Sequence, residues 1–536
     1  MAPRRHRRFA ALAAPATALA LALALAAPAA ALPPEADAWC ADHAEPCALL
    51  TGAWAVAETI PPGEQALLAW RDLGTALAAV GAPEAAAVGF ANAQAQAETV
   101  EDAEDRVDAL MVVLRARAAA GFQETARQQV LDALTFTDTI SRNTDRIDAR
   151  EAIVAAAADA GLWTEAIGIA RAEDNARRRL LGLLTVGDAM ARAGESADAV
   201  ALAEEVSTLD GARPQDVLDA AAVAARAGAP EEAQAILDQV DPAERTIDGL
   251  IAVAEAYDAA GDGEQAVRLL DEALSAARSI EVPQDRPDAA RTQAGLRASS
   301  MMSVGLALAE LGLTDRARET FAEALAAAPV YVAEELGRDI TAADYPALAA
   351  RLQARAGLLA DALQSMAQAT AGRNLELTVT LAQQAGVPAE DWLEATDAVA
   401  AVEFPGVRAR ALSAIVVALS QAGRADEVAA AADAALAAAL DIPEVWMRDV
   451  ALGDVAAALA TAGQREAALA IVEAHADRAD SPRARIGEAM AAAGLYDDAQ
   501  ALAAAIDSAV LRARVLRAIV RTQSEAAVAT VAAASE

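Results

Sequence analysis

Two cysteines, Cys40 and Cys47, are the residues whose type and spacing most directly suggest a chemistry. They lie seven positions apart in Trp-Cys-Ala-Asp-His-Ala-Glu-Pro-Cys and are the chain's only cysteines. In an oxidising compartment such a pair favours one short-loop disulfide. The alternative is a metal site built from Cys40, His43 and Cys47, but no fourth Cys or His lies nearby to complete tetrahedral coordination. We therefore predict a disulfide and no metal.

An arginine cluster is the second group with a chemistry of its own. Its members lie within nine positions of one another and are Arg171, Arg177, Arg178 and Arg179. Guanidinium groups bind carboxylates through paired hydrogen bonds, so the cluster is a candidate site for a partner's carboxylate. The alternative is that these arginines pair with acids nearby in the sequence, namely Asp145, Asp148, Glu173 and Asp174.

The residue inventory excludes several other chemistries. All 43 basic residues are arginine, so the chain has no lysine for a Schiff base or a phosphate-binding loop. Beyond residue 31 it has two histidines, His43 and His475, which are too far apart for a histidine-based triad. We expect no cofactor and no enzymatic activity. The 79 acidic residues leave one alternative open, a hydrolase or small-ligand site made from clustered carboxylates.

Charge and the first residues bear on partners and localisation. The net charge of −36 repels phosphate backbones and anionic lipids, which excludes nucleic acid and favours a basic protein or peptide partner. Residues 1–31 have a basic start, an apolar stretch from Phe9 to Ala26 and small residues up to Ala31. This is typical of a secretory signal peptide, with an uncleaved membrane anchor as the alternative. We expect cleavage after Ala31, a periplasmic or secreted protein and no stable membrane insertion.

A repeated glycine signature indicates the architecture. A short apolar segment ends in glycine, and a second segment has alanine five residues later in ten of twelve cases; Asp391 and Val428 are the exceptions. The glycines are 81, 121, 161, 194, 228, 261, 312, 357, 386, 423, 463 and 494. Glycine takes the left-handed conformation that ends a helix, and alanine lets two helices approach closely. The pattern therefore predicts stacked helix pairs.

Two of these units resemble the tetratricopeptide repeat family. The second of them matches the family's pattern at Gly305, Leu308, Gly312, Ala317, Phe321, Ala324 and Pro329. The resemblance implies an all-α fold, a right-handed α-solenoid of stacked antiparallel helix pairs. Residues 340–440 have spacings that also fit a related two-helix repeat of irregular length.

These patterns divide the chain into four parts. Residues 1–31 are the signal peptide, and residues 32–60 form an N-terminal cap with the disulfide loop. Residues 61–505 form the TPR-like array, and residues 506–536 form a capping helix and a frayed tail. Alanine richness and the absence of lysine suggest a bacterial source.

Repeat architecture favours binding over catalysis. We expect an exported, non-catalytic scaffold that binds a polypeptide, or assembles an envelope complex, along its concave face. Four tryptophans are either interface anchors or core residues: Trp70, Trp163, Trp392 and Trp446.

Overall fold

The computed structural model contains helices and no strand among the residues that it describes. These are residues 32–283, 285–328, 345–367, 405–421, 423–475 and 480–535, together with 385, 387, 388 and 399. The residues of the signal-peptide prediction, Trp392 and Gly386 therefore lie outside the described residues. The fold class is an all-α solenoid of stacked antiparallel helix pairs, as the glycine signature predicts.

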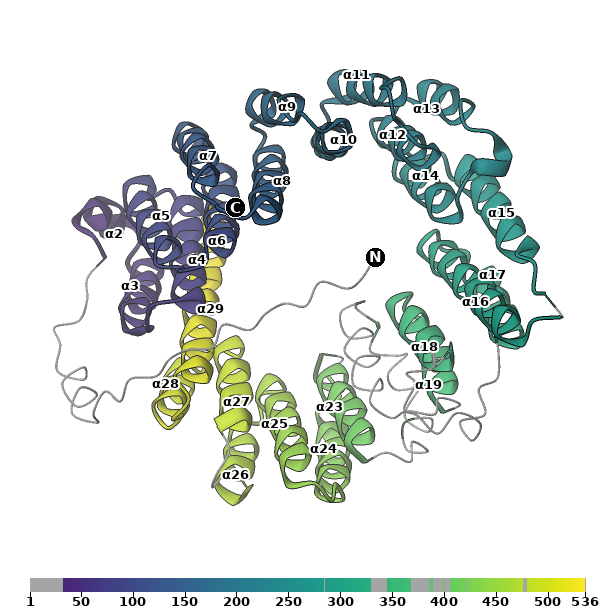
Figure 1. Ribbon diagram of the computed structural model, residues 1–536. Coiled ribbons are helices and arrows are strands. Elements are labelled where there is room, and N and C mark those ends of the chain that lie inside the picture. The colour runs from purple at the N-terminus through teal and green to yellow at the C-terminus, as the bar shows by residue number, and fades with distance from the viewer. Residues whose placement is uncertain are drawn as a thin grey trace.

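Each pair has one helix on the inner side of a curved array and one on the outer side (Figure 1). The inner helices of the first half are α4 (Glu64–Ala79), α6 (Ala103–Ala119), α8 (Asn143–Asp159), α10 (Ala176–Ala193), α12 (Pro214–Arg226) and α14 (Ile247–Ala259). Those of the second half are α16 (Pro287–Glu310), α18 (Tyr345–Arg355), α23 (Pro405–Gln421), α25 (Val445–Thr461), α27 (Asp480–Ala492) and α29 (Ala509–Ser535). Each inner helix packs against the next one, from α4 to α18 and from α23 to α29.

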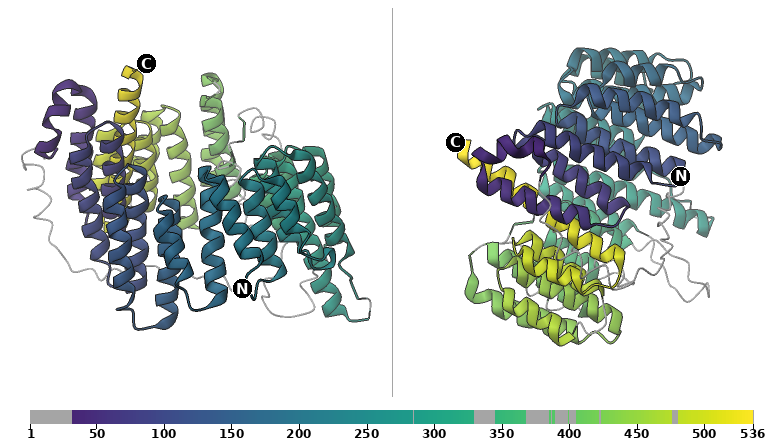
Figure 2. Two further views of the ribbon diagram at one scale, coloured as in Figure 1. Left: turned by 90° about the horizontal axis from the view of Figure 1, so that it is seen from above. Right: turned by 90° about the vertical axis from the view of Figure 1, so that its left-hand side faces the viewer.

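The outer helices cover the inner layer and complete each pair. They are α3 (Ala44–Thr59), α5 (Pro83–Glu98), α7 (Gln123–Thr137), α9 (Trp163–Arg171), α11 (Ser196–Ser207) and α13 (Pro230–Leu237), then α15 (Gly263–Ser279), α17 (Thr314–Ala327), α19 (Leu359–Ala367), α24 (Ala425–Leu440), α26 (Arg465–His475) and α28 (Tyr496–Ala504). Two 3₁₀ turns, Pro34–Ala36 and Pro242–Glu244, and the short helix α2 (Asp37–Asp42) complete the described elements. Figure 2 shows the helices standing side by side around the array.

The turn at Gly261 shows how the signature produces a pair. Gly261 has φ +87°, and the amide of Asp262 donates to the carbonyl of Tyr257 at 2.8 Å, which closes the end of α14. Asp262 then caps α15 by accepting from the amide of Gln265. Ala266, at the fifth position, is fully buried between the helices. All eleven signature glycines in the described residues have φ between +70° and +88°, so the predicted role of these glycines is confirmed.

The two ends of the array meet, and this is the largest difference from the sequence analysis. We expected residues 32–60 and residues 506–536 to cap opposite ends. The structure instead packs α29 against α3 and α4, so that α29 and α3 occupy the places of an inner and an outer helix in one unit (Figure 1). We call this contact the seam. The physical reason is burial, because each cap would otherwise leave an apolar face in water.

The seam has a well-packed interior. Leu50 of α3 and Val520 of α29 are fully buried. The ring of Trp54 on α3 packs edge-to-face on Trp70 of α4 with 4.8 Å between ring centroids. Gly52 lies so close to α29 that a Cβ there would sit 3.2 Å from Nε2 of Gln523. The chain after 506 is thus helical to Ser535 and is part of the array.

Candidate functional site

Ion pairs join the inner helices to one another, and we call this set the inner charge ladder. Its members are Arg115–Asp159, Arg192–Asp159, Arg226–Asp188, Arg355–Glu310, Arg410–Asp454, Arg485–Asp454, Arg514–Glu488 and Arg517–Asp72. Each pair connects two neighbouring inner helices, and the last one, with 3.6 Å between Nε of Arg517 and Oδ2 of Asp72, crosses the seam. The inner surface is therefore polar, with most of its charges compensated.

Among the described residues, no ion pair joins α12 to α14 or α14 to α16, and in this interruption of the ladder Glu255 of α14 lies near Glu310 of α16. Burial raises the pKa of Glu255 above its ordinary value, and the nearby Glu310 carboxylate raises it further. Arg226 and Arg355 act in the opposite direction on the same group. This place on the inner surface would accept positive charge from outside.

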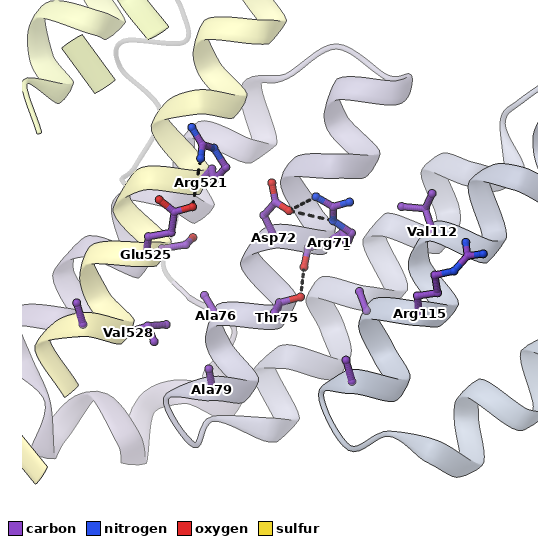
Figure 3. A pocket seen from close by; sticks show the side chains of 14 residues that line it. Arg71, Asp72, Thr75, Ala76, Ala79, Val112, Arg115, Arg521, Glu525 and Val528 are labelled. Carbon is purple, nitrogen blue, oxygen red and sulfur yellow. Dashed lines mark hydrogen bonds and ion pairs between the residues drawn. The ribbon is translucent and has the colours of Figure 1, made fainter. Parts of the chain in front are cut away.

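A second interruption lies between α4 and α6, where a cavity opens beside the seam (Figure 3). In the described part of the chain, no ion pair joins these two helices, and each presents an arginine to the cavity, Arg71 and Arg115. The cavity has a volume of about 840 Å³ and is lined by α4, α6 and α29. This size is within the range of sites that hold small organic ligands.

The charged groups of the cavity are three arginines and two acids. Arg71 donates to its neighbour Asp72, with 2.9 Å between Nε and Oδ1. On α29, Nη1 of Arg521 lies 3.3 Å from Oε1 of Glu525. Arg115 donates from Nε to Oδ2 of Asp159 at 2.8 Å. The lining thus has three arginines and two acids, and the acid that pairs with Arg115 lies outside it.

The remaining lining is apolar with two hydroxyls. Small and branched apolar side chains come from all three helices: Ala76, Ala79, Val112, Ala116, Ala119, Val528 and Ala529. Thr75 donates its hydroxyl to the carbonyl of Arg71 at 3.0 Å. Ser524 is only 2 % exposed, and its Oγ has no hydrogen-bond partner among the described residues. An unpaired buried hydroxyl is costly, so the Ser524 hydroxyl would gain from a hydrogen bond to a ligand in the cavity.

The structure distributes the predicted arginine cluster among intramolecular partners. Arg171 pairs with Glu205 at 2.6 Å, Arg178 pairs with Glu173 at 3.4 Å, and Arg177 pairs with the fully buried Asp216. Nη1 of Arg179 donates to the carbonyl of Glu173 at 2.9 Å. Hydrogen bonding to Glu205 raises the pKa of Arg171, which holds this side chain in its charged, paired form. Of the acids proposed from sequence, Glu173 is used by the cluster, whereas Glu205 and Asp216 come from other helices.

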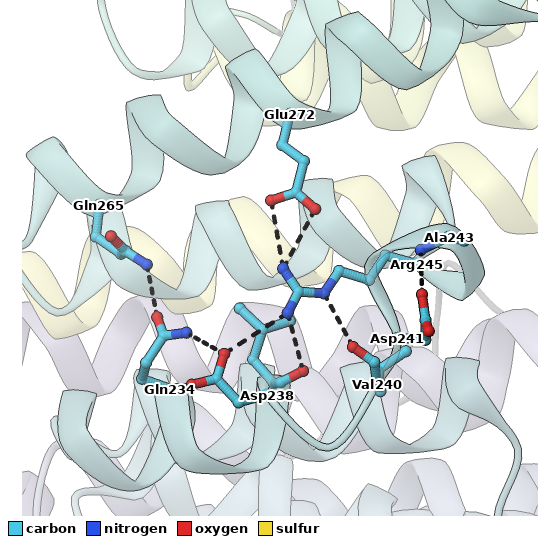
Figure 4. A network of polar contacts seen from close by, with 9 residues as sticks. Gln234, Asp238, Val240, Asp241, Ala243, Arg245, Gln265 and Glu272 are labelled. Carbon is cyan, nitrogen blue, oxygen red and sulfur yellow. Dashed lines mark hydrogen bonds and ion pairs between the residues drawn. The ribbon is translucent and has the colours of Figure 1, made fainter.

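An arginine elsewhere, Arg245, is mostly buried and uses all three nitrogens of its guanidinium group in hydrogen bonds. Arg245 follows the turn Pro242–Glu244 and donates from Nη1 to both carboxylate oxygens of Glu272 on α15, at 3.2 and 3.4 Å (Figure 4). It also donates to the carbonyls of Leu237 and Val240. The three guanidinium nitrogens thus join the pair α12–α13 to the pair α14–α15. Arg115 differs because no partner lies within hydrogen-bonding distance of its two terminal nitrogens in the described part of the chain.

The cysteines and tryptophans have separate positions. Cys40 and Cys47 form a disulfide with 5.2 Å between their Cα atoms, so neither thiol is available as a metal ligand. No group of three or more metal-binding side chains occurs among the described residues. Trp70 is buried at the seam, Trp163 is half-buried, and Trp446 is 69 % exposed beside the exposed Val445. The tryptophans are therefore not one surface.

Sequence reasoning missed the cavity for a simple reason. Arg71, Arg115 and Arg521 are separated by tens to hundreds of positions, and only the meeting of the two ends brings the third to the first two.

Among the described helices, none is long and apolar enough to cross a membrane.

Comparisons with known proteins add little to this picture. No family model matches the chain, and no curated protein matches it. The crystal structure of Ton1535 from Thermococcus onnurineus NA1 is 14% identical and has a TM-score of 0.24, with 75% of this chain and 94% of that chain covered. A circular tandem repeat protein with novel repeat topology and enhanced subunit contact surfaces is 13% identical with a TM-score of 0.15, covering 92% of this chain and 100% of that chain. Both TM-scores are below 0.5, so the fold assignment rests on the helices of this chain.

Proposed function

We propose that this protein is an exported, non-catalytic scaffold that binds a polypeptide on the inner surface of its helical array. The observation that carries the proposal is the inner surface itself. It presents a polar charge ladder that is interrupted in two regions of the described residues, from α12 to α16, where Glu255 lies near Glu310, and between α4 and α6, where Arg71 and Arg115 line the cavity. Polypeptides carry both kinds of charge and fit long surfaces of stacked repeats.

Within the cavity, the arrangement of acids supports binding over hydrolysis, the alternative function. A glycoside hydrolase needs two carboxyl groups that face one reacting bond. The two acids of the cavity, Asp72 and Glu525, are each held by an arginine. Paired acids of this kind orient and neutralise charge but do not supply a proton donor with a free partner base.

We further propose that the repeats are of the tetratricopeptide type. Phe321 is fully buried, and a Cβ at Gly305 would meet its ring at 3.4 Å, which agrees with the small and aromatic positions of that family's pattern. Leu308 and Ala317 are also fully buried. Gly305→Leu should destabilise the array, because the larger side chain would collide with Phe321. An unchanged free energy of unfolding would contradict this repeat register.

Export is a separate proposal and rests on residues 1–31. Expression in a Gram-negative host with fractionation should give a periplasmic or secreted protein that begins at Leu32. Intact mass measured before and after reduction would show both the cleavage and the disulfide. A product that retains residues 1–31 in the membrane fraction would contradict cleavage.

Photo-crosslinking from defined positions tests the binding surface. A photoreactive residue is placed either at Ala79, which is exposed on the inner helix α4, or at Leu131, which is 46 % exposed on the outer helix α7. The proposal predicts that polypeptides of an envelope extract crosslink from position 79 and not from position 131. Crosslinking from position 131 alone, or from neither position, would contradict inner-surface binding.

A further inference from the structure

The cavity beside the seam is the place on the inner surface where the structure most directly points to a ligand. Two arginines of its lining, Arg71 and Arg115, belong to neighbouring inner helices that share no ion pair within the described residues. Most other neighbouring inner helices are joined by an acid of one helix and an arginine of the next. Arg71 and Arg115 already pair with Asp72 and Asp159, so an anion between α4 and α6 would bind the guanidinium nitrogens that these acids leave unused.

The donors at this place match a carboxylate. A guanidinium binds a carboxylate with two parallel N–H···O bonds, and the terminal nitrogens of Arg115 are available for this geometry. Ser524 adds a buried hydroxyl without a partner from the α29 side. Three helices thus supply donors to one volume, and the ligand would join α29 to α4 and α6.

The apolar lining describes the rest of the ligand. Val112, Ala116 and Val528 provide methyl groups from α6 and α29, and Ala76 and Ala79 provide them from α4. A volume of about 840 Å³ accommodates a few apolar residues together with a terminal carboxylate. Phosphate esters fit less well, because the two acids Asp72 and Glu525 share the same lining and would repel a dianion.

We propose that the seam cavity binds a carboxylate attached to a short apolar group, and that its source is the C-terminal end of a polypeptide. The choice of source rests on the proposed function, in which the inner surface holds a polypeptide. The carboxylate lies between Arg71 and Arg115 and accepts from Ser524. The last apolar side chains contact the alanine and valine lining.

Isothermal titration of the purified full chain with three probes tests this. The probes are an acetylated Ala-Val-Ala-Val peptide with a free C-terminal carboxylate, the same peptide with a C-terminal amide, and hexanoate. The free-acid peptide should bind, and the amide should bind about tenfold more weakly or not at all, because it lacks the charge that the arginines recognise. Binding should also weaken as salt is raised.

Variants assign any binding to the cavity. Arg115→Gln should weaken the free-acid peptide by about tenfold. Arg291→Gln is the matched control, because Arg291 is partly exposed on α16, as Arg115 is on α6, and pairs with Asp288 of its own helix. Ser524→Ala should weaken binding by a few fold without lowering the melting temperature, since the hydroxyl makes no hydrogen bond in the unliganded protein.

The possible outcomes test the cavity proposal and the proposed function separately. Binding of the free-acid peptide that is lost in Arg115→Gln and kept in Arg291→Gln supports both. Hexanoate that binds as tightly as the peptide, with the same response to Arg115→Gln, supports a carboxylate cavity and contradicts the polypeptide source. If no carboxylate probe binds, or if binding ignores Arg115→Gln, the cavity proposal is overturned while inner-surface crosslinking remains an independent test of the function.

Discussion

The unit α14–α15 and the unit formed by α29 and α3 each consist of one inner and one outer helix, but they are built differently. The first is a continuous hairpin whose turn is set by Gly261 and whose contact is set by Ala266. The second has no connecting turn, and its two helices come from distant parts of the chain. One unit is held by a local turn as well as by packing, the other only by contacts between distant parts of the chain. The unit at the seam is therefore the one that a change in tertiary contacts should destabilise most.

Removing α29 should have the largest effect. A chain that stops at Ser508 loses the buried side chains of Val515, Ile519 and Val520 and exposes the faces of α3, α4 and α27 that α29 covers. Burial of each such side chain contributes about 1.5–3 kcal/mol, so the loss is on the order of 5–10 kcal/mol. Urea unfolding followed by circular dichroism measures it. A chain shortened only after Val531 is the control, and equal stability of the two truncations would mean that α29 does not close the array.

Shortening Trp70 to alanine should have the next largest effect. Trp70 is 6 % exposed and packs on Trp54 of α3, so Trp70→Ala leaves a cavity at the seam and should cost about 3–5 kcal/mol. Trp446→Ala is the matched control, because Trp446 is 69 % exposed and its removal should change stability by less than about 0.5 kcal/mol. Thermal melts compare the two variants. Equal destabilisation would contradict the burial assigned to Trp70.

Overpacking tests the continuous unit in the same way. Ala266→Leu inserts a larger side chain between α14 and α15, where Ala266 is fully buried, and should cost about 1–3 kcal/mol. Ala259→Leu, on the exposed side of α14, should be close to neutral. Denaturant unfolding of both proteins gives the difference. A neutral Ala266→Leu would contradict the proposed register.

The ion pair across the seam should contribute less than packing does. Arg517 and Asp72 are partly buried and lie 3.6 Å apart, so their coupling free energy should be about 1 kcal/mol or less. A double-mutant cycle of Arg517→Gln and Asp72→Asn measures the coupling, and raised salt should reduce it. Coupling of several kcal/mol would show that charge, and not packing, holds the seam.

Acid should weaken contacts between ordinary units by a small amount. The hydrogen bond from Arg465 lowers the pKa of Asp498 below its ordinary value, and Arg278 does the same for Glu323. A carboxyl whose pKa is lowered by folding stabilises the folded state above its unfolded pKa, and this contribution is lost as pH falls through the folded value. Stability should therefore decrease below about pH 4, and Asp498→Asn should flatten that decrease. If Asp498→Asn leaves the pH dependence of stability unchanged, the ion pair of Arg465 and Asp498 does not cause it.

The parts of the fold that could be predicted from sequence are those that local chemistry determines. Gly261 and Ala266 identify a turn and a close contact because only residues within a few positions take part. The partners of Arg171 and Arg177 could not be predicted, since Glu205 and Asp216 come from helices more than thirty positions away. The cavity was missed for the same reason. Its α29 wall joins α4 only through the seam, and a unit without a turn has no glycine signature.

Pulsed electron–electron double resonance between spin labels at positions 79 and 529 tests most directly whether the two ends of the array meet. Ala79 on α4 and Ala529 on α29 are both exposed and line the same cavity, and the two native cysteines are held in a disulfide and take no label. Closure predicts one short, narrow distance distribution that is kept in dilute, low-salt solution. A broad distribution at long distances would show that the ends are apart and that neither the seam nor its cavity exists in solution.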